Sequence, residues 1–489
     1  MNNELLKSTE ILEKCEEIKN QKWLIGHNFH QFDRTFQDFY QKFKHQEKRS
    51  KILLVESSSL RFLAIFLAAV AADCPLFLCN PNWRDREWEQ VLQLVQPDII
   101  VGQVNSSLPN FKYFKKYKFV SEYREIVIGR IHERWVQSSS THKSQWDSSP
   151  PPHAIMIPTG GSSGKIRFAI HTWETLSASV RGFCQYFEQE KVNSFCVLPL
   201  YHVSGLMQFM RSFTTGGKLL LLPYKSLKSG EKSAIAPQDW FISLVPTQLQ
   251  FLLKQDASWL AKFDTVLLGG APAWDSLLNE ARANKISLAP TYGMTETASQ
   301  VMTLKPHDFL QKCDGIGRVL PHARVKILGS DGEQCKSYQT GIITLQGDSL
   351  FLGYYPQLNR EKTFKTDDLG YFDDAGYFYV VGRNSRKIIT GGENVFPAEV
   401  EAAILGTEWV KDVCAIGVRD RAWGEIIVAV YVPQSPKVPL DEVKSAIAPK
   451  LSRFKHPKEW IETQQLPRND QGKVNYQAVR EIALHSLAR

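Results

Sequence analysis

The chain has 489 residues, of which 43% are hydrophobic, 22% charged and 11% aromatic, a composition that excludes an intrinsically disordered or collagen-like chain. This length predicts about three domains or subdomains, each able to bury its own core. The 59 Lys and Arg against 51 Asp and Glu give a net charge of +8, which over this length does not demand a nucleic-acid partner and favours anionic small molecules.

The first predicted elements form a β-α-β unit. A strand-like segment at 52–56 precedes an apolar helix at 62–72, and further strand-like segments follow at 75–81 and 97–101. Eleven apolar residues are too few to cross a bilayer, and the N-terminus lacks the layout of a secretory signal. The eight cysteines form no CxxC pair, so we expect reduced thiols, no structural zinc and a cytoplasmic protein.

The middle of the chain alternates strands with helices. Residues 112–118 interleave aromatic and basic side chains, which suits either single-stranded nucleic acid or a solvated surface; we expect the surface and no nucleic-acid partner. Residues 136–152 have the composition of a surface loop. Strand-like segments then lie at 153–158, 195–200, 218–223, 240–246 and 265–270, a pattern that predicts parallel sheets covered by helices.

From about residue 315 the sequence pattern predicts mainly β-strands. Strands are expected at 341–347 and 376–383, then a helix at 397–405, strands at 414–418 and 426–433 and a helix at 440–451. The predicted fold is therefore α/β: a large N-terminal domain, residues 1–383, with two α/β subdomains and a β-rich part, followed by a small mobile α+β domain, residues 384–489.

A run of small and hydroxylated residues follows one apolar strand directly, at Thr159–Lys165. Glycines let backbone N–H groups approach an anion, and hydroxyl groups add donors, so this segment suits a phosphate. The glycine spacing is not that of a P-loop, and Ile166 stands where a Mg²⁺-binding hydroxyl would be. A flexible connector is the alternative for this segment taken alone.

The segment resembles the phosphate loop TSGTTGxPKG of the acyl-adenylate-forming superfamily, with departures at Gly160, Ile166, Arg167 and Phe168. Further motifs of that superfamily follow in its order. They are Pro199–Gly205 (PLFHxxG), Gly269–Pro272 (the adenine turn), Tyr292–Glu296 (YGxTE), Thr366–Gly370 (TGDLG, with Asp367 for Gly), Gly382–Arg383, Gly391–Gly392 and Pro467–Lys473 (PRTxxGK).

This resemblance implies an ATP-dependent, AMP-forming acid–thiol ligase that uses Mg²⁺ and CoA. Lys473, His202 and Thr159 would be catalytic, and Glu296 would bind Mg²⁺. The residues implied for ATP are Thr159, Gly160, Gly161, Ser162, Ser163, Gly164, Gly270, Ala271, Pro272, Thr291, Tyr292, Gly293, Met294, Thr295, Asp368, Arg383 and Lys473. Gly391 and Gly392 would border the CoA thiol, and Ser385 would be the hinge of the C-terminal domain, although the family often has Asp or Lys there.

Two stretches of the sequence indicate which carboxylic acid is the substrate. Residues 158–173 and 292–302 are similar to 2-succinylbenzoate–CoA ligases of menaquinone and phylloquinone synthesis, the first to their cyanobacterial and plastid branch. That substrate is a dicarboxylate, so one carboxylate must be held unreacted by donors. The expected acyl site comprises His202, Ser204, Gly205, Gln208, Arg211, Gly269, Ser299 and Gln300.

Arg211 is the expected holder of that carboxylate, with Ser299 and Gln300 as second candidates. A surface salt bridge for Arg211 and helix-surface positions for Ser299 and Gln300 are the alternatives. Three other functions stay open: a CoA ligase for benzoates or fatty acids, an adenylation enzyme that loads a carrier protein, and a non-catalytic nucleotide-binding scaffold. A monomer and a homodimer are both compatible with the sequence.

Overall fold

The computed structural model describes residues 11–18, 22–45, 49–102, 118–120, 126–129, 151, 153–160, 165–232, 235–359, 361–436, 438–468 and 474–487. Residues 112–117 of the basic stretch and nearly all of the expected loop at 136–152 lie outside these ranges. The predicted α/β fold with a separate C-terminal domain is confirmed. No helix in the described ranges is long and apolar enough to cross a membrane.

The first sheet contains the predicted β-α-β unit, whose helix α3 (Ser59–Ala71) joins two parallel strands. Its strand order is β5-β6-β4-β2-β3-β7-β8. The strands are β2 (Ile52–Leu54), β3 (Leu76–Leu78), β4 (Ile99–Gly102), β5 (Lys118–Val120), β6 (Ile126–Gly129), β7 (Ala154–Gly160) and β8 (Ile166–Thr172). Because α3 is apolar on nearly all sides, it is stable only when it is enclosed, and its residues from Phe62 to Val70 are buried.

The second sheet has parallel strands at its centre and the antiparallel β14 and β15 at one edge. Its order is β1-β10-β9-β11-β12-β13-β14-β15. The strands are β1 (Leu24–Ile25), β9 (Asn193–Cys196), β10 (Leu219–Leu221), β11 (Trp240–Leu244), β12 (Thr265–Leu268), β13 (Leu288–Met294), β14 (Ser299–Thr303) and β15 (Arg318–Val319). The segment predicted at 195–200 is shifted, since β9 ends before Pro199, which has no N–H group for a ladder.

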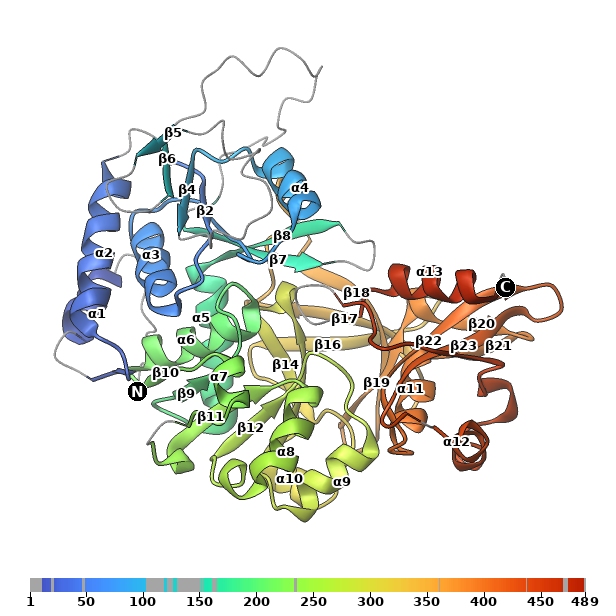
Figure 1. Cartoon of the computed structure of the whole chain (residues 1–489). Coiled ribbons are helices and arrows are strands. Elements are labelled where there is room, and N and C mark those ends of the chain that lie inside the picture. Colours follow the sequence, from blue (N-terminus) through green and yellow to red (C-terminus); the bar gives the residue numbers. More distant parts are fainter. Residues whose placement is uncertain are drawn as a thin grey trace, which may run out of the picture.

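Helices fill the space between these sheets and cover their outer faces (Figure 1). Apolar residues of α2 (Phe29–Lys44), α3, α5 (Trp173–Phe187) and α6 (Val203–Thr215) form one buried cluster with strands of both sheets. Helix α4 (Asp85–Val95) covers the far side of the first sheet, and α8 (Pro246–Leu260) and α9 (Asp275–Ala283) cover that of the second. The shorter helices are α1 (Ile11–Ile18), α7 (Tyr224–Lys228), α10 (Pro306–Leu310), η4 (Pro237–Asp239) and η5 (Thr295–Thr297).

The β-rich part is an antiparallel sheet that packs beside β13 and β14 through one apolar cluster. Its strands, in spatial order, are β16 (Ala323–Leu328), β17 (Gly341–Gly347), β18 (Thr363–Phe372) and β19 (Phe378–Arg383). Asp368 on β18 pairs with Arg383 on β19. The sheet therefore presents a carboxylate and a guanidinium side by side, next to the end of β13.

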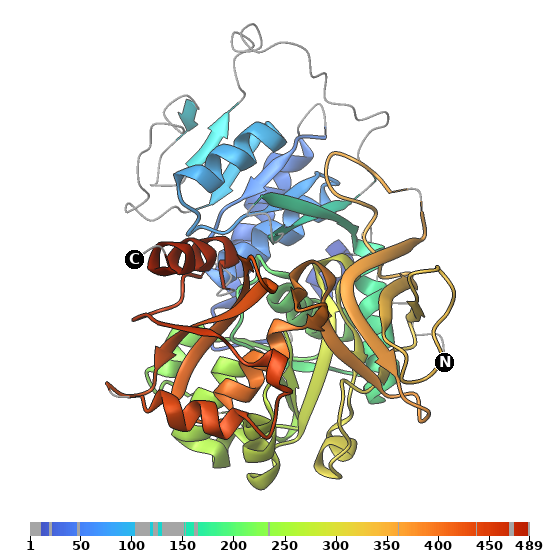
Figure 2. The same cartoon turned by 90° about the vertical axis from the view of Figure 1, so that its right-hand side faces the viewer.

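The C-terminal elements form a sheet with its own core and face the viewer in Figure 2. They are η6 (Asn384–Arg386), β20 (Ile388–Thr390), β21 (Glu393–Val395), α11 (Pro397–Leu405), β22 (Val410–Asp420), β23 (Gly424–Pro433), α12 (Leu440–Ile447), η7 (Arg453–Lys455), β24 (Glu459–Glu462) and α13 (Tyr476–Leu487). Helix α12 ends before the predicted residue 451, because Pro449 cannot continue a helix. The boundary predicted between residues 383 and 384 falls between β19 and η6 and stays a prediction.

Candidate active site

The hydroxyl group of Tyr292 connects the second sheet to the β-rich sheet. It donates a hydrogen bond of 2.7 Å to Oδ2 of Asp368, and Nε of Arg383 lies 3.2 Å from Oδ1 of the same carboxylate. Burial, followed by the Asp368 charge, raises the pKa of Tyr292 well above its usual value, so the phenol keeps its proton. Three residues from separate predicted motifs thus meet at one carboxylate.

The turn after β12 lies directly beside β13, because the two strands are parallel neighbours. A Cβ atom on Gly269 would lie 2.6 Å from Oγ1 of Thr291, and the Thr291 hydroxyl donates to the Leu268 carbonyl at 3.2 Å. Gly270 has a φ of +82°, a conformation that glycine adopts without strain. The expected adenine turn and the Tyr292 motif are therefore adjacent.

A second carboxylate, Glu296, lies in η5 and is 6% exposed. Tyr354 donates a hydrogen bond of 2.6 Å to its Oε1 atom. The preceding residue, Thr295, is anchored from behind, since Nε2 of His171 lies 2.7 Å from its carbonyl oxygen. Burial lowers the pKa of His171 to about 4, so this imidazole is neutral and donates through Nε2.

The Glu296 carboxylate offers the oxygen ligands that Mg²⁺ prefers. The described residues contain no group of three or more His, Cys, Asp or Glu side chains placed to hold a metal. Mg²⁺ bound with a nucleotide needs only one or two protein carboxylates, because phosphates and water supply its other ligands. A single carboxylate at this position therefore fits a nucleotide-bound Mg²⁺ better than a closed protein cage.

Arg211 lies on α6 with its side chain buried, and it is 2% exposed. Its guanidinium donates to Oε1 of Gln300 at 3.0 Å and to Oγ of Ser299 at 3.3 Å, and it lies 4.1 Å from the Phe183 ring centroid. No carboxylate of the described residues forms an ion pair with it. Burial lowers the pKa of Arg211 to about 10, which leaves it charged.

The surface salt bridge considered for Arg211 is wrong. Ser299 and Gln300 lie on β14 instead of a helix, because they pair with Met294 and Gly293 of β13. The close approach requires glycine at 293, where a Cβ atom would lie 2.1 Å from the Ser299 carbonyl oxygen. Ser299 and Gln300, which were expected to donate hydrogen bonds to the unreacted carboxylate, therefore lie on the strand next to the one that carries Tyr292.

The other expected acyl-site residues lie at the start of α6. His202 is the N-cap residue, and its ring lies 4.5 Å from that of Tyr201. The Gln208 amide donates to the Ser204 carbonyl at 2.9 Å. A Cβ atom on Gly205 would lie 2.2 Å from the Pro199 carbonyl oxygen, so this turn accepts no larger residue.

Two expected segments fall partly outside the described residues. Thr159 and Gly160 end β7 and pair with Arg167 and Ile166 of β8, whereas Gly161, Ser162, Ser163 and Gly164 between them are not described. Lys473 also lies outside; the residues that flank its segment, Arg468 and Val474, form an antiparallel bridge. The roles expected of these residues stay predictions.

The residues expected at the hinge and near CoA lie on the C-terminal side. The Asp367 carboxylate accepts hydrogen bonds from the backbone N–H of Ser385, at 3.0 Å, and from its hydroxyl. Gly391 has a φ of +58°, its N–H donates to the Trp423 carbonyl at 2.8 Å, and a Cβ atom there would lie 2.9 Å from the Trp423 ring. Gly392 has a φ of +84°.

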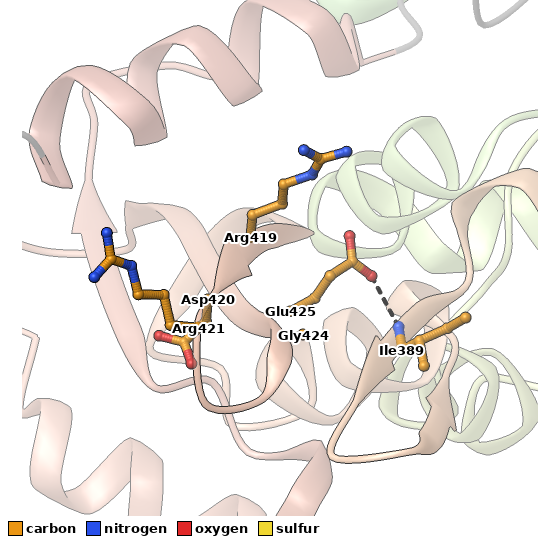
Figure 3. A pocket seen from close by; sticks show the side chains of 6 residues that line it. All are labelled: Ile389, Arg419, Asp420, Arg421, Gly424 and Glu425. Carbon is orange, nitrogen blue, oxygen red and sulfur yellow. Dashed lines mark hydrogen bonds between the residues drawn. The ribbon is translucent and has the colours of Figure 1, made fainter.

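An open hollow of about 540 Å³ lies at the connection between β22 and β23 (Figure 3). It is lined by Ile389, Arg419, Asp420, Arg421, Gly424 and Glu425. Arg419 extends from the end of β22 and Arg421 from the turn that follows it, and Glu425 accepts a hydrogen bond of 2.9 Å from the Ile389 N–H (Figure 3). The two guanidinium groups share this hollow with the carboxylates of Asp420 and Glu425, so its lining carries no net charge.

Sequence reasoning missed four residues that support the site: His171, Tyr354, Arg167 and Asp367. Three of them form hydrogen bonds with residues more than 15 positions away, namely Thr295, Glu296 and Ser385. No local pattern encodes such a contact. For Arg167 and Asp367, the only sequence signal of a special role was that each departs from the superfamily motif in which it stands.

Comparisons with known proteins agree with this geometry. Residues 29–355 match the model of the AMP-binding enzyme family, and residues 399–473 match that of the AMP-binding enzyme C-terminal domain. A 2–succinylbenzoate–CoA ligase of Listeria monocytogenes is 35% identical over 353 residues, which cover 69% of this chain and 71% of the relative.

The fold is that of o-succinylbenzoate CoA synthetase from Bacillus subtilis. The structure of that enzyme in complex with its acyl-adenylate intermediate gives a TM-score of 0.81 at 23% identity, covering 96% of this chain and 98% of the other. The complex of that enzyme with ATP and magnesium gives a TM-score of 0.79 at 23% identity, covering 96% of this chain and 99% of the other.

Proposed function

The chain belongs to the AMP-binding enzyme family, and on that premise we propose that it is an ATP-dependent, AMP-forming ligase that joins 2-succinylbenzoate to CoA. Relatives that are 33 to 35% identical carry the name of that enzyme. The reaction would proceed through an acyl-adenylate and would serve menaquinone or phylloquinone biosynthesis.

The buried guanidinium of Arg211 is the observation that carries the choice of acid. A buried charge is costly without a partner of opposite sign, and no described carboxylate pairs with Arg211. A dicarboxylate would supply that partner with the carboxylate that does not react. A benzoate or a fatty acid has only one carboxylate, which adenylation consumes, so it would leave the guanidinium without a counter-ion.

The nucleotide would lie along the Tyr292 motif. The Asp368 carboxylate, held by Tyr292 and Arg383, is suited to accept hydrogen bonds from the ribose hydroxyls. The turn at Gly270, Ala271 and Pro272 would border the adenine. Gly293 and Met294 continue the strand that carries Tyr292 and would lie near the nucleotide.

A carboxylate is already a nucleophile, so the first step needs alignment and charge stabilisation rather than a general base. The hydroxyls of Thr159 and Thr295, the loop at 160–164 and Lys473 would bind the phosphate oxygens. Glu296 would hold Mg²⁺, which when bound supplies positive charge to the phosphates. His202 would border the acyl group at the start of α6.

The second step brings the CoA thiol to the activated carbonyl. Gly391 and Gly392 would let the thiol arm pass, after a pivot of the C-terminal domain near Ser385. Arg419 and Arg421 line a hollow together with Ile389, which precedes Gly391 by two residues, and their guanidinium groups would pair with the phosphates at the far end of CoA.

Pyrophosphate release with a panel of acids, with and without CoA, tests the proposal. We expect 2-succinylbenzoate to give the highest kcat/KM and CoA to convert the adenylate to a thioester. If benzoate or palmitate is the better substrate, another CoA ligase is the correct function. If CoA has no effect and a carrier protein accepts the acyl group, the protein is a carrier-loading enzyme. Absence of any acid-dependent pyrophosphate release would leave a non-catalytic scaffold.

A cytoplasmic location and a homodimer stay predictions, to be tested by cell fractionation and sedimentation.

A further inference from the structure

Tyr354 is fixed at the site by its backbone. The segment around it pairs with β8, since Tyr354 bridges to Ala169, the Leu352 N–H donates to the Ile170 carbonyl at 2.8 Å, and the Tyr355 N–H donates to the Phe168 carbonyl at 2.9 Å. These bonds hold the segment against the strand that follows the expected phosphate loop. The backbone around Tyr354 is therefore held by β8, and also by Glu296 itself, because the Phe351 N–H donates to the Glu296 carbonyl at 2.9 Å.

The ring of Tyr354 also has one contact over its face and one aromatic contact of the edge-to-face kind. The guanidinium of Arg167 lies 4.1 Å from its centroid, and the Phe351 ring lies 4.8 Å away at an angle of 63°. Contacts of both kinds stabilise an aromatic ring in one orientation. A cation over the ring also makes the phenol a stronger hydrogen-bond donor, because it draws electron density from the oxygen.

The hydroxyl of this fixed ring points at Glu296. Its hydrogen bond of 2.6 Å to Oε1 has the length of a strong bond to a charged acceptor. Among the described residues, Oε2 of Glu296 takes part in no hydrogen bond. One carboxylate oxygen is thus held by the protein while the other stays available for a ligand.

We propose that Tyr354 is a positioning residue that orients the Glu296 carboxylate for the Mg²⁺ bound with ATP, with Arg167 holding the Tyr354 ring. The inference rests on the proposed function for the identity of the cation. A glutamate has several side-chain rotamers, and a bond to a fixed donor removes the entropic cost of choosing one. Residues that orient metal ligands in this way typically change metal affinity by about 10- to 100-fold when they are replaced.

Tyr354→Phe tests the proposal, because it removes the hydroxyl and keeps the ring under Arg167. Mn²⁺ replaces Mg²⁺ as the probe, and its affinity for the full-length protein with ATP is measured by electron paramagnetic resonance. We expect the dissociation constant of Mn²⁺ to rise at least about tenfold, while the affinity for ATP in EDTA stays the same. An unchanged Mn²⁺ affinity, or an equal loss of ATP affinity in EDTA, would overturn the proposal.

Tyr431→Phe is the matched control, since Tyr431 also donates to a glutamate, Glu462 at 3.3 Å, but lies in the C-terminal domain. It should leave the Mn²⁺ affinity unchanged. Measurements on the original protein distinguish failure of the proposed function from failure of the role proposed for Tyr354. If it binds Mn²⁺ with ATP but shows no acid-dependent pyrophosphate release, the proposed function fails while the role of Tyr354 can stand.

Discussion

Tyr292 and Asp368, 76 positions apart in the chain, are joined by a hydrogen bond of 2.7 Å that links the second sheet to the β-rich sheet. Asp368 is 8% exposed and has Arg383 as its second partner. The carboxylate is thus held in place before any ligand arrives, which lowers the cost of ordering it on binding.

Asp368→Asn should weaken AMP binding by about 10- to 100-fold, because hydrogen bonds to a charged group contribute about 1.5–3 kcal/mol. Isothermal titration calorimetry measures the change. Asp367→Asn is the control, since that carboxylate bonds to Ser385 instead. An equal loss in both variants would show that the effect is not specific to the ribose position.

Arg211→Met should lower kcat/KM for 2-succinylbenzoate by about 100-fold or more, because a partnered buried charge typically contributes about 2–5 kcal/mol. The free energy of unfolding should stay within about 1 kcal/mol of the original, since removing an unpaired buried charge offsets the loss of its bonds to Ser299 and Gln300. Steady-state kinetics and urea unfolding provide the two readouts. The exposed Arg181 offers the control variant Arg181→Met. Full activity of Arg211→Met would refute the assigned role.

Asp367→Gly restores the residue that the superfamily motif has and removes both bonds to Ser385. A net loss of about 1 kcal/mol of local stability corresponds to about fivefold faster opening. Hydrogen exchange should therefore speed up at the Ser385 amide, whose N–H is the donor at 3.0 Å. The Lys387 amide, which bonds to Asn384 instead, serves as the internal comparison. Unchanged exchange at Ser385 would mean that Asp367 does not hold this segment.

The stability of the chain should depend on pH through Glu401. Burial raises the pKa of this carboxyl group from 4.5 to about 7, with the bond from the Ala415 N–H and the charge of Arg386 acting in the opposite direction. The folded state therefore keeps a proton that the unfolded state loses. The stabilisation is fully present below about pH 4.5 and is lost as the pH rises to 7, by at most about 3 kcal/mol.

Glu401→Gln removes this titration. Its free energy of unfolding in urea should change less between pH 5 and pH 8 than that of the original protein, with a gain at pH 8. Glu393→Gln, at an exposed position, controls for loss of charge. Equal pH dependence in the original and in Glu401→Gln would contradict the prediction.

The fold followed from patterns that act over short distances. Alternation of apolar strands and helices predicted β2, α3 and β3, and Pro397 marked the start of α11 correctly. Such signals reflect local backbone preference and burial, which neighbouring residues determine.

The supports of the site did not follow from the sequence, for the same reason. His171 reads as one more residue of an apolar strand, yet its imidazole fixes the Thr295 carbonyl across 124 positions. Tyr354 reaches Glu296 only because its segment pairs with β8. Long-range partners of this kind depend on how sheets pack, and a single sequence carries no direct record of that packing.

The most direct test of the central claim is a crystal structure of the protein with a non-hydrolysable analogue of the 2-succinylbenzoyl adenylate. The account predicts ribose hydroxyls within hydrogen-bond distance of Asp368, the adenine beside Tyr292, and the free carboxylate of the acyl group on the Arg211 guanidinium. An analogue bound elsewhere, or a free carboxylate that points away from Arg211 into solvent, would contradict it.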